Sequence, residues 1–201
     1  MLSIVYGAKI GKFPTFAPEI QGNVSMKETF CKWLLRRLGW KFGPTSENLP
    51  KCVICVAPHT SNFDFILGKL YYAAIGRKAH FLMKKEWFFF PLNLVFKQMG
   101  GVPVDRKKTK SITDRMVKEF ARYKYLHLAI TPEGTRKKVD EWKKGFYFIA
   151  LKALVPIQLA YIDYNKKEMG FKATFYPTGN VEEDIHTIRS YYKGMTGRNS
   201  G

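Results

Sequence analysis

His59 and Asp64 are the residues whose types and spacing most clearly suit chemistry. They follow the apolar run 52–57, which predicts a buried strand, and ligands of α/β folds tend to bind beyond the carboxyl ends of strands. On one continuous helix the two side chains would point about 140° apart. Ser61 or Asn62 is a favourable N-cap, however, which would leave His59 in a loop and place Asp64 in the first helical turn.

From that turn, the carboxylate of Asp64 can reach back to one ring nitrogen of His59. It would then fix the tautomer and raise the basicity of the other nitrogen, as a general base requires. The alternative is a purely structural Asp64 at the start of a helix, because an isolated H-x4-D spacing also arises by chance.

Two further segments place an arginine just beyond a predicted strand. One is G-V-P-V-D-R, which ends at Arg106, and the other is T-P-E-G-T-R, which ends at Arg136. Each guanidinium can donate paired hydrogen bonds to a phosphate, and Glu133 and Thr135 can bond to hydroxyl groups. Taken singly, each arginine is equally consistent with a surface residue in a turn.

In this order and at these distances, the segments resemble the glycerolipid acyltransferase family, whose best-known bacterial members are 1-acylglycerol-3-phosphate acyltransferases. The H-x4-D pair matches the first block of that family, and residues 101–106 and 133–136 match the second and third. The Lys-Lys-Gly run at 143–145, followed by Val-Pro-Ile at 155–157, is similar to the fourth. The resemblance covers roughly residues 50–162 and implies an α/β acyltransferase.

The resemblance also implies a mechanism. His59 would take a proton from an acceptor hydroxyl, whose oxygen attacks the thioester carbonyl of acyl-CoA or acyl carrier protein. Asp64 would orient His59, with no covalent acyl-enzyme, no cofactor and no metal. The expected acceptor is the lysolipid 1-acylglycerol-3-phosphate, which would give phosphatidic acid. The implied acceptor-binding residues are Arg106, Glu133, Gly134, Thr135 and Arg136.

Three positions depart from the family pattern. Pro58 stands where members often have Asn, Thr131 where they often have Phe, and Lys137 where they often have Ser. None of these changes removes a catalytic group. They leave open acylation of another lysolipid, including one with an amino-acid headgroup.

Strand and helix patterns alternate along the chain, which predicts an α/β fold with a central, mostly parallel or mixed sheet flanked by helices. Predicted strands cover 52–57, 80–83, 102–104, 127–131 and 155–163, with an edge strand at 171–176. Predicted helices cover 63–74, 110–124, 146–154 and 181–192. We assign residues 46–201 to one acyltransferase domain and residues 1–25 to a leader.

Residues 26–45 form a basic amphipathic helical segment with an aromatic face, which ends near Gly39. Such a helix can lie in a membrane interface. The resemblance favours this role, because similar family members dock on the bilayer that holds their substrates. The alternative is a helix docked on its own domain. The predicted membrane-binding residues are Phe30, Lys32, Trp33, Arg36, Arg37 and Trp40.

The aromatic run Trp-Phe-Phe-Phe-Pro at 87–91 is a second candidate membrane surface. Lys84, Lys85 and Lys97 flank it in the sequence. An ordinary place in the hydrophobic core is an equally good interpretation.

The charge balance indicates a polyanionic partner. The chain has 201 residues, with 34 Lys and Arg against 16 Asp and Glu, and a net charge of +18. The excess is spread over the first three quarters rather than held in a tail, and no nucleic-acid recognition motif is present, so nucleic acid is the weaker alternative. The expected partners are an anionic membrane surface, a lysolipid acceptor, and acyl-CoA or acyl carrier protein.

Cysteine content and hydropathy limit the location of the protein. Three cysteines exclude a disulfide-dense scaffold, and Cys52 and Cys55 fit buried apolar positions better than a zinc site, because no second ligand pair matches. His80, His127 and His186 have no partner pattern and are interpreted as structural. No signal peptide is evident, and no run reaches the ~18–20 apolar residues of a membrane span. We therefore expect a peripheral protein on the cytoplasmic face of the cell membrane.

Overall fold

The structure is a computed structural model that describes residues 25–104, 109–136 and 139–199. Its centre is a seven-stranded sheet in the order β1-β7-β6-β2-β5-β3-β4. Neighbouring strands of this sheet pair in parallel, except the antiparallel pair β6 and β7. The strands are β1 (Lys41–Phe42), β2 (Lys51–Val56), β3 (His80–Lys84), β4 (Gly101–Val104), β5 (Leu126–Ile130), β6 (Ile157–Asp163) and β7 (Glu168–Phe175).

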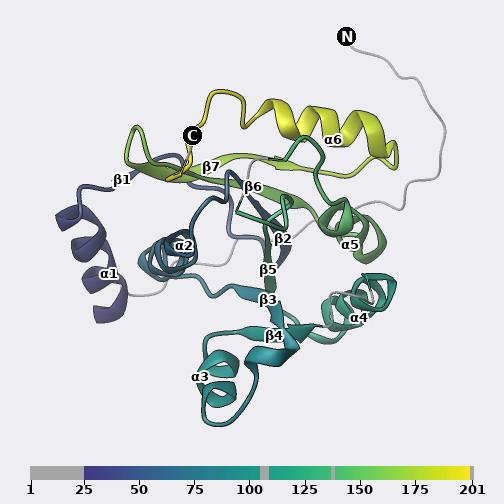
Figure 1. Cartoon of the computed structure of the whole chain (residues 1–201), viewed down its shortest axis with the longest axis horizontal. Coiled ribbons are helices and arrows are strands. Elements are labelled where there is room, and N and C mark those ends of the chain that lie inside the picture. Colours follow the sequence, from purple (N-terminus) through teal and green to yellow (C-terminus); the bar gives the residue numbers. More distant parts are fainter. Residues whose placement is uncertain (1–24, 105–108, 137–138, 200–201) are drawn as a thin grey trace.

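Helices cover the sheet from two sides. Helices α1 and α2 lie on one side, and α4 and α5 lie on the other (Figure 1). The helices are α1 (Met26–Arg37), α2 (Phe63–Ala74), the short 3₁₀ helix η1 (Lys85–Trp87), α3 (Leu92–Gln98), α4 (Thr109–Arg122), α5 (Gly145–Ala153) and α6 (Val181–Ser190).

Strand β2 runs through the middle of the core. Its residue Val53 packs into the hydrophobic cluster under α4 and α5, with Phe120 among the partners, whereas Ile54 packs into the cluster under α1 and α2 with Leu67. Burial on both faces explains why this strand is apolar throughout rather than alternating. The predicted fold class, a mixed sheet flanked by helices, is confirmed.

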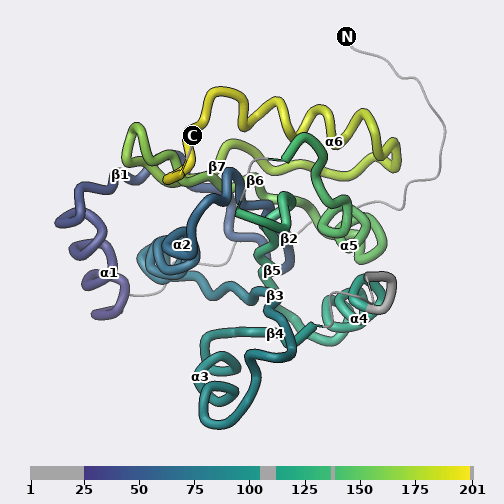
Figure 2. The backbone as a smooth tube through the Cα atoms, in the orientation of Figure 1, coloured from purple at the N-terminus to yellow at the C-terminus, as the bar shows by residue number. Residues whose placement is uncertain are grey.

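Each predicted helix and strand overlaps an observed element, and α2 has the predicted bounds. The prediction of an edge strand at 171–176 is confirmed only in part. β1 occupies that edge of the sheet and pairs with Glu168 and Met169 of β7, whereas among the described strands residues 171–175 pair with β6 alone. A strand of two residues is too short to show a period-two pattern. Helix α3 was not predicted, and Figure 2 shows it with its preceding loop beyond β4 at one end of the sheet.

Helix α1 packs one face on α2 and exposes the other. Cys31 and Leu35 are buried in the cluster shared with α2. Phe30 and Trp33, on the outer face, are 58% and 55% exposed. Among the described helices, none combines the length and the apolar character needed to cross a bilayer.

Trp40, which follows α1, does not belong to that exposed face. The chain turns at Gly39, whose φ is +82°, and Trp40 enters the core with 6% of its surface exposed. Its ring meets Tyr164 edge-on, with 5.1 Å between the ring centroids. The prediction that Trp40 contacts a membrane is therefore wrong.

His127 of β5 is fully buried and bonded at both ring nitrogens. The Leu49 carbonyl can only accept, so Nε2 carries the proton, and Nδ1 accepts a hydrogen bond from the Tyr72 hydroxyl at 2.9 Å. Burial is the main cause that lowers the pKa of His127 to about 4. These contacts agree with the structural role that the sequence predicts.

We expect the protein to lose stability as the pH falls from 6.5 towards 4. An unfolded chain protonates this histidine below its ordinary pKa of 6.5, whereas the folded chain does so only near 4. His127 alone then lowers the free energy of unfolding by about 3 kcal/mol across this window. Thermal denaturation at several pH values tests this, and the His127→Gln variant should show a shallower loss. Equal slopes in the two proteins would contradict it.

Candidate active site

The predicted catalytic residues lie where two neighbouring parallel strands end. Strands β2 and β5 pair in parallel, so their carboxyl ends share one edge of the sheet. The loop after β2 carries His59, and the loop after β5 carries Glu133. The backbone N–H of His59 donates to Oε2 of Glu133 at 2.8 Å. The two loops are thus joined directly at the site.

Asp64 reaches back to His59 as the sequence predicts. Nδ1 of His59 lies 3.1 Å from Oδ2 of Asp64, and the backbone N–H groups of Thr60 and Ser61 each donate to the same oxygen at 2.9 Å. The Tyr164 hydroxyl donates to the other oxygen, Oδ1. Burial opposes ionisation of Asp64, but these hydrogen bonds, led by that from His59, outweigh it and lower its pKa.

The pair has the arrangement of a general base and its orienting carboxylate. Asp64 is almost completely buried, whereas 19% of the His59 side chain remains exposed. With Nδ1 facing Asp64, Nε2 is the nitrogen left to take a proton from a ligand. The site can therefore deprotonate a hydroxyl group held beside it.

The start of α2 differs in detail from the expected cap. The helix begins at Phe63 with Asn62 as N-cap, but the Asn62 side chain makes no capping hydrogen bond. Instead its Oδ1 accepts from Arg136 at 3.0 Å, and the Ser61 hydroxyl accepts from the Phe63 N–H at 3.1 Å. Asn62 therefore connects the start of α2 to the loop that carries Arg136.

That loop has a shape which depends on Gly134. Its φ is +64°, in the left-handed region that favours glycine, so a larger residue would strain the backbone there. Thr135 and Arg136 follow on the exposed side. Burial is the largest influence on the neighbouring Glu133 and raises the pKa of its carboxyl.

The structure brings most of the predicted site residues together. His59, Asp64, Glu133 and Arg136 are linked through direct hydrogen bonds or through the start of α2, and Gly134 and Thr135 lie in the same loop. Arg106 lies outside the described residues, beyond the end of β4.

Sequence reasoning missed two contributors to the site. Tyr164 directly follows β6, which is parallel to β2, so its place beyond a strand end was an available signal. The segment 196–199 carried no such signal. In it, Asn199 bonds Thr60 through its backbone N–H at 3.3 Å and its side-chain amide at 3.1 Å, and the Arg198 guanidinium lies 5.0 Å from the centroid of the Phe63 ring.

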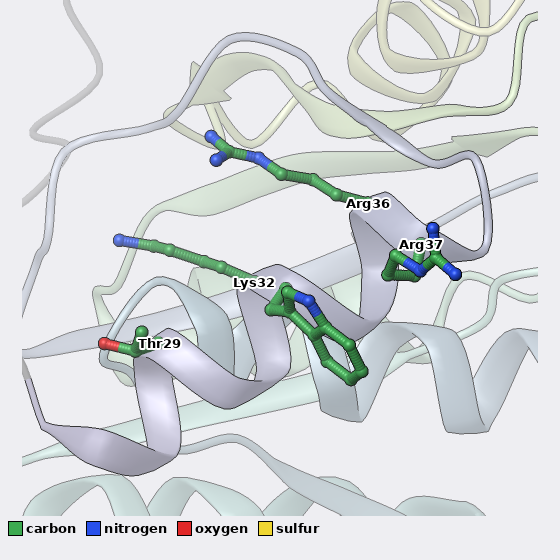
Figure 3. A pocket seen from close by; sticks show the side chains of 5 residues that line it. Thr29, Lys32, Arg36 and Arg37 are labelled. Carbon is green, nitrogen blue, oxygen red and sulfur yellow. The ribbon is translucent and has the colours of Figure 1, made fainter.

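A hollow on the surface of α1 lies apart from His59 and Asp64. Its lining residues are Thr29, Lys32, Trp33, Arg36 and Arg37. Figure 3 shows the Lys32 and Arg36 side chains extending in a similar direction from the helix. This hollow holds none of the residues around His59, and its basic lining belongs to the face of α1 that the sequence assigns to a membrane.

Comparisons with known proteins identify the family of the chain. The model of the acyltransferase family matches residues 44–163, which include the H-x4-D pair and the loop of Arg136. The crystal structure of the 1-acyl-sn-glycerophosphate (LPA) acyltransferase PlsC from Thermotoga maritima is similar, with a TM-score of 0.54 and 21% identity over 85% of this chain and 80% of that one. A search of curated protein sequences finds no match. Because the family model covers more than half of the residues, this chain belongs to the acyltransferase family.

Proposed function

We propose that this acyltransferase moves an acyl group from acyl-CoA or acyl carrier protein to the hydroxyl of a lysolipid, with 1-acylglycerol-3-phosphate as acceptor. The observation that carries the proposal is the buried Asp64 carboxylate held on Nδ1 of a partly exposed His59. An arginine fixed to the start of the same helix supplies a charge for a phosphate headgroup. The matching family model supports the type of reaction.

In the proposed reaction, Nε2 of His59 takes the proton of the acceptor hydroxyl as its oxygen attacks the thioester carbonyl. The tetrahedral intermediate then collapses, the carbon–sulfur bond breaks, and the thiol leaves with the proton from the imidazolium. The product is an ester and a free thiol. Asp64 holds the imidazole in place and stabilises its positive charge during the transfer.

The acceptor site that we propose includes Arg106, Gly134, Thr135 and Arg136. Glu133 completes the set that the resemblance implies, and the contact it makes within the protein is with the His59 backbone. We therefore assign Glu133 the task of holding the catalytic loop, which leaves phosphate recognition to the arginines.

A panel of lysolipids tests the proposed function. The full-length protein is incubated with a radiolabelled acyl thioester and with lysophosphatidate, neutral lysolipids or amino-acid-headed lysolipids. The proposal predicts labelled diacyl product, with lysophosphatidate used most efficiently. Preferential labelling of an amino-acid-headed lysolipid would instead support the alternative acceptor, and no labelled lipid with any acceptor would refute acyl transfer to lysolipids.

Arg136→Gln should weaken acceptor binding more than it slows the chemical step. Loss of one charge-assisted contact to a phosphate predicts a rise of about 10-fold or more in KM for lysophosphatidate. Steady-state kinetics with the acceptor varied measures this. Arg122→Gln is the matched control, because α4 leads into the amino end of β5, at the opposite edge of the sheet. Equal KM values for the two variants would contradict the assignment.

We also propose that the outer face of α1 binds an anionic membrane surface on the cytoplasmic side. Phe30 and Trp33 are exposed there, and Lys32, Arg36 and Arg37 lie on the same helix. Basic residues near an anionic bilayer contribute ~1 kcal/mol each. Replacing both aromatic residues with serine should weaken binding to anionic vesicles, and unchanged binding would argue against this role for α1.

A further inference from the structure

A second exposed apolar surface lies on η1, α3 and the loop between them. We call it the apolar ridge, and its members are 49–79% exposed. Isolated exposed apolar side chains are common on proteins, but a group within nine consecutive positions indicates an interaction surface. The ridge consists of Trp87, Phe89, Phe90, Leu94 and Val95.

The base of the ridge is anchored in the fold. The Phe88 and Phe96 rings pack with their centroids 5.9 Å apart, and a Cβ on Gly101 would meet both Phe88 and the Phe96 carbonyl. Lys69 of α2 donates to the carbonyl of Met99, just after α3, at 2.7 Å. Because these inner contacts are in place, the outer side chains are held exposed by the packing beneath them.

The ridge begins at the same edge of the sheet as the catalytic pair. Strand β3 is parallel to β5, so η1 leaves the sheet at the edge where His59 and Glu133 lie. The ridge and α2 also lie on the same face of the sheet. Phe81 of β3 packs against Phe65 of α2, and it pairs with Gly101, which lies beneath α3. A flat partner on the ridge would therefore approach the edge of the sheet at which the site lies.

The charges around the ridge suit an anionic partner. Lys84, Lys85 and Lys97 are exposed beside it, against one exposed acidic residue, Glu86. Aromatic and aliphatic side chains with lysines at their border are typical of proteins that insert into the headgroup region of a bilayer.

We propose that the apolar ridge is a second membrane contact, which inserts into an anionic bilayer and, together with α1, fixes the orientation of the protein. The carboxyl edge of the sheet would then face the lipid surface, where a lysolipid hydroxyl is located. Binding to lipid can be measured without turnover, so only the consequence for catalysis rests on the proposed function.

Vesicle binding by the full-length protein tests the proposal. The variant carries Phe89→Ser and Phe90→Ser, and the control carries Tyr191→Ser, an exposed aromatic residue just after α6. With vesicles of phosphatidylcholine and phosphatidylglycerol, the ridge variant should bind at least 10-fold more weakly, while the control binds like the unaltered protein. A Lys84→Gln, Lys85→Gln variant should lose binding to these vesicles but not the weaker binding to pure phosphatidylcholine.

Two results would overturn the proposal. One is unchanged vesicle binding by the ridge variant. The other is a change in oligomeric state on gel filtration without a change in vesicle binding, which would assign the ridge to a second copy of the chain. If the proposed reaction is wrong but the ridge does bind membranes, vesicle binding still falls in the ridge variant, and neither the variant nor the unaltered protein transfers acyl groups.

Tyr164 carries a separate inference about the catalytic pair. Its hydroxyl donates to Oδ1 of Asp64, while Oδ2 receives His59 and two backbone N–H groups. The Tyr164 ring rests on Trp40, and its backbone N–H donates to the Thr196 carbonyl at 3.0 Å. Both carboxylate oxygens are thereby held, which prevents rotation of the carboxylate away from the imidazole.

We infer that Tyr164 is a positioning residue that acts on the reaction through Asp64, on the basis of the proposed function. Tyr164→Phe should lower kcat about 10-fold and leave the KM values for both substrates nearly unchanged. In an Asp64→Asn background the same change should have little further effect. Tyr161→Phe is the matched control, because it removes a β6 hydroxyl that bonds Glu168, and it should leave kcat unchanged.

An equal loss of kcat from Tyr164→Phe in both backgrounds would contradict this role. So would a change confined to KM. If the Asp64→Asn protein is too slow to assay, the downfield Nδ1–H proton resonance of His59 gives a second readout. That resonance should broaden or shift in Tyr164→Phe but not in Tyr161→Phe, even if the protein proves not to transfer acyl groups.

Discussion

Replacement of His59 by alanine is expected to lower kcat for acyl transfer by roughly 10³-fold. The reason is that Nε2 of His59 is the group placed to take a proton, and an acceptor hydroxyl is a weak nucleophile at neutral pH. KM for the acceptor should change little, because the proposed phosphate contacts lie on another loop. Steady-state kinetics with labelled acyl thioester measures both quantities.

The melting temperature serves as the control for this variant, because it shows whether the loop that carries residue 59 remains folded. The backbone N–H of His59, which donates to Glu133, remains in the alanine variant, so the melting temperature should stay close to that of the unaltered protein. A variant that melts normally and retains most of its kcat would exclude His59 as the general base.

Asp64→Asn is expected to lower kcat by roughly 10²-fold and to lower stability as well. The carboxylate accepts from four donors, which are the ring of His59, two backbone N–H groups and the Tyr164 hydroxyl. An amide offers one acceptor oxygen, so its NH₂ group must face at least one of these donors in a nearly fully buried position. The imidazole also loses the negative charge that stabilises its protonated form.

Kinetics and thermal denaturation together test this second expectation. Asp184→Asn is a useful control, because Asp184 is an equally buried carboxylate whose hydrogen-bond donors, Tyr147 and Thr178, are not part of the site around His59. It should lower stability without a comparable loss of kcat. If the two variants lose activity in proportion to stability, Asp64 has a structural role only.

Local sequence signals predicted much of the contact between His59 and Asp64. The five-residue spacing and the cap-forming residues Ser61 and Asn62 placed Asp64 in the first turn of a helix, and the 3.1 Å contact with His59 follows from that placement. The hydrogen bond that Asn62 accepts from Arg136 could not be predicted. Its partner Arg136 lies 74 residues away, and nothing local distinguishes a cap from a bridge between loops.

Long-range packing explains the other differences. Trp40 has the spacing and chemistry of a membrane anchor, but the turn at Gly39 directs it onto Tyr164, which lies beyond β6. The Tyr164 hydroxyl reaches a carboxylate 100 residues earlier in the chain, and only the parallel alignment of β2 and β6 brings them together. Periodicity reports which face of an element is apolar, but not which distant residue meets it.

A single-turnover experiment tests the central claim most directly. The protein is mixed with a labelled acyl thioester and lysophosphatidate in anionic vesicles, and the lipid and protein fractions are separated after quenching. We predict one labelled phosphatidate for each thiol released and no label on the protein. The His59→Ala variant should form both products roughly 10³-fold more slowly. Label that appears as free fatty acid at the same rate with and without the acceptor would contradict acyl transfer by this site.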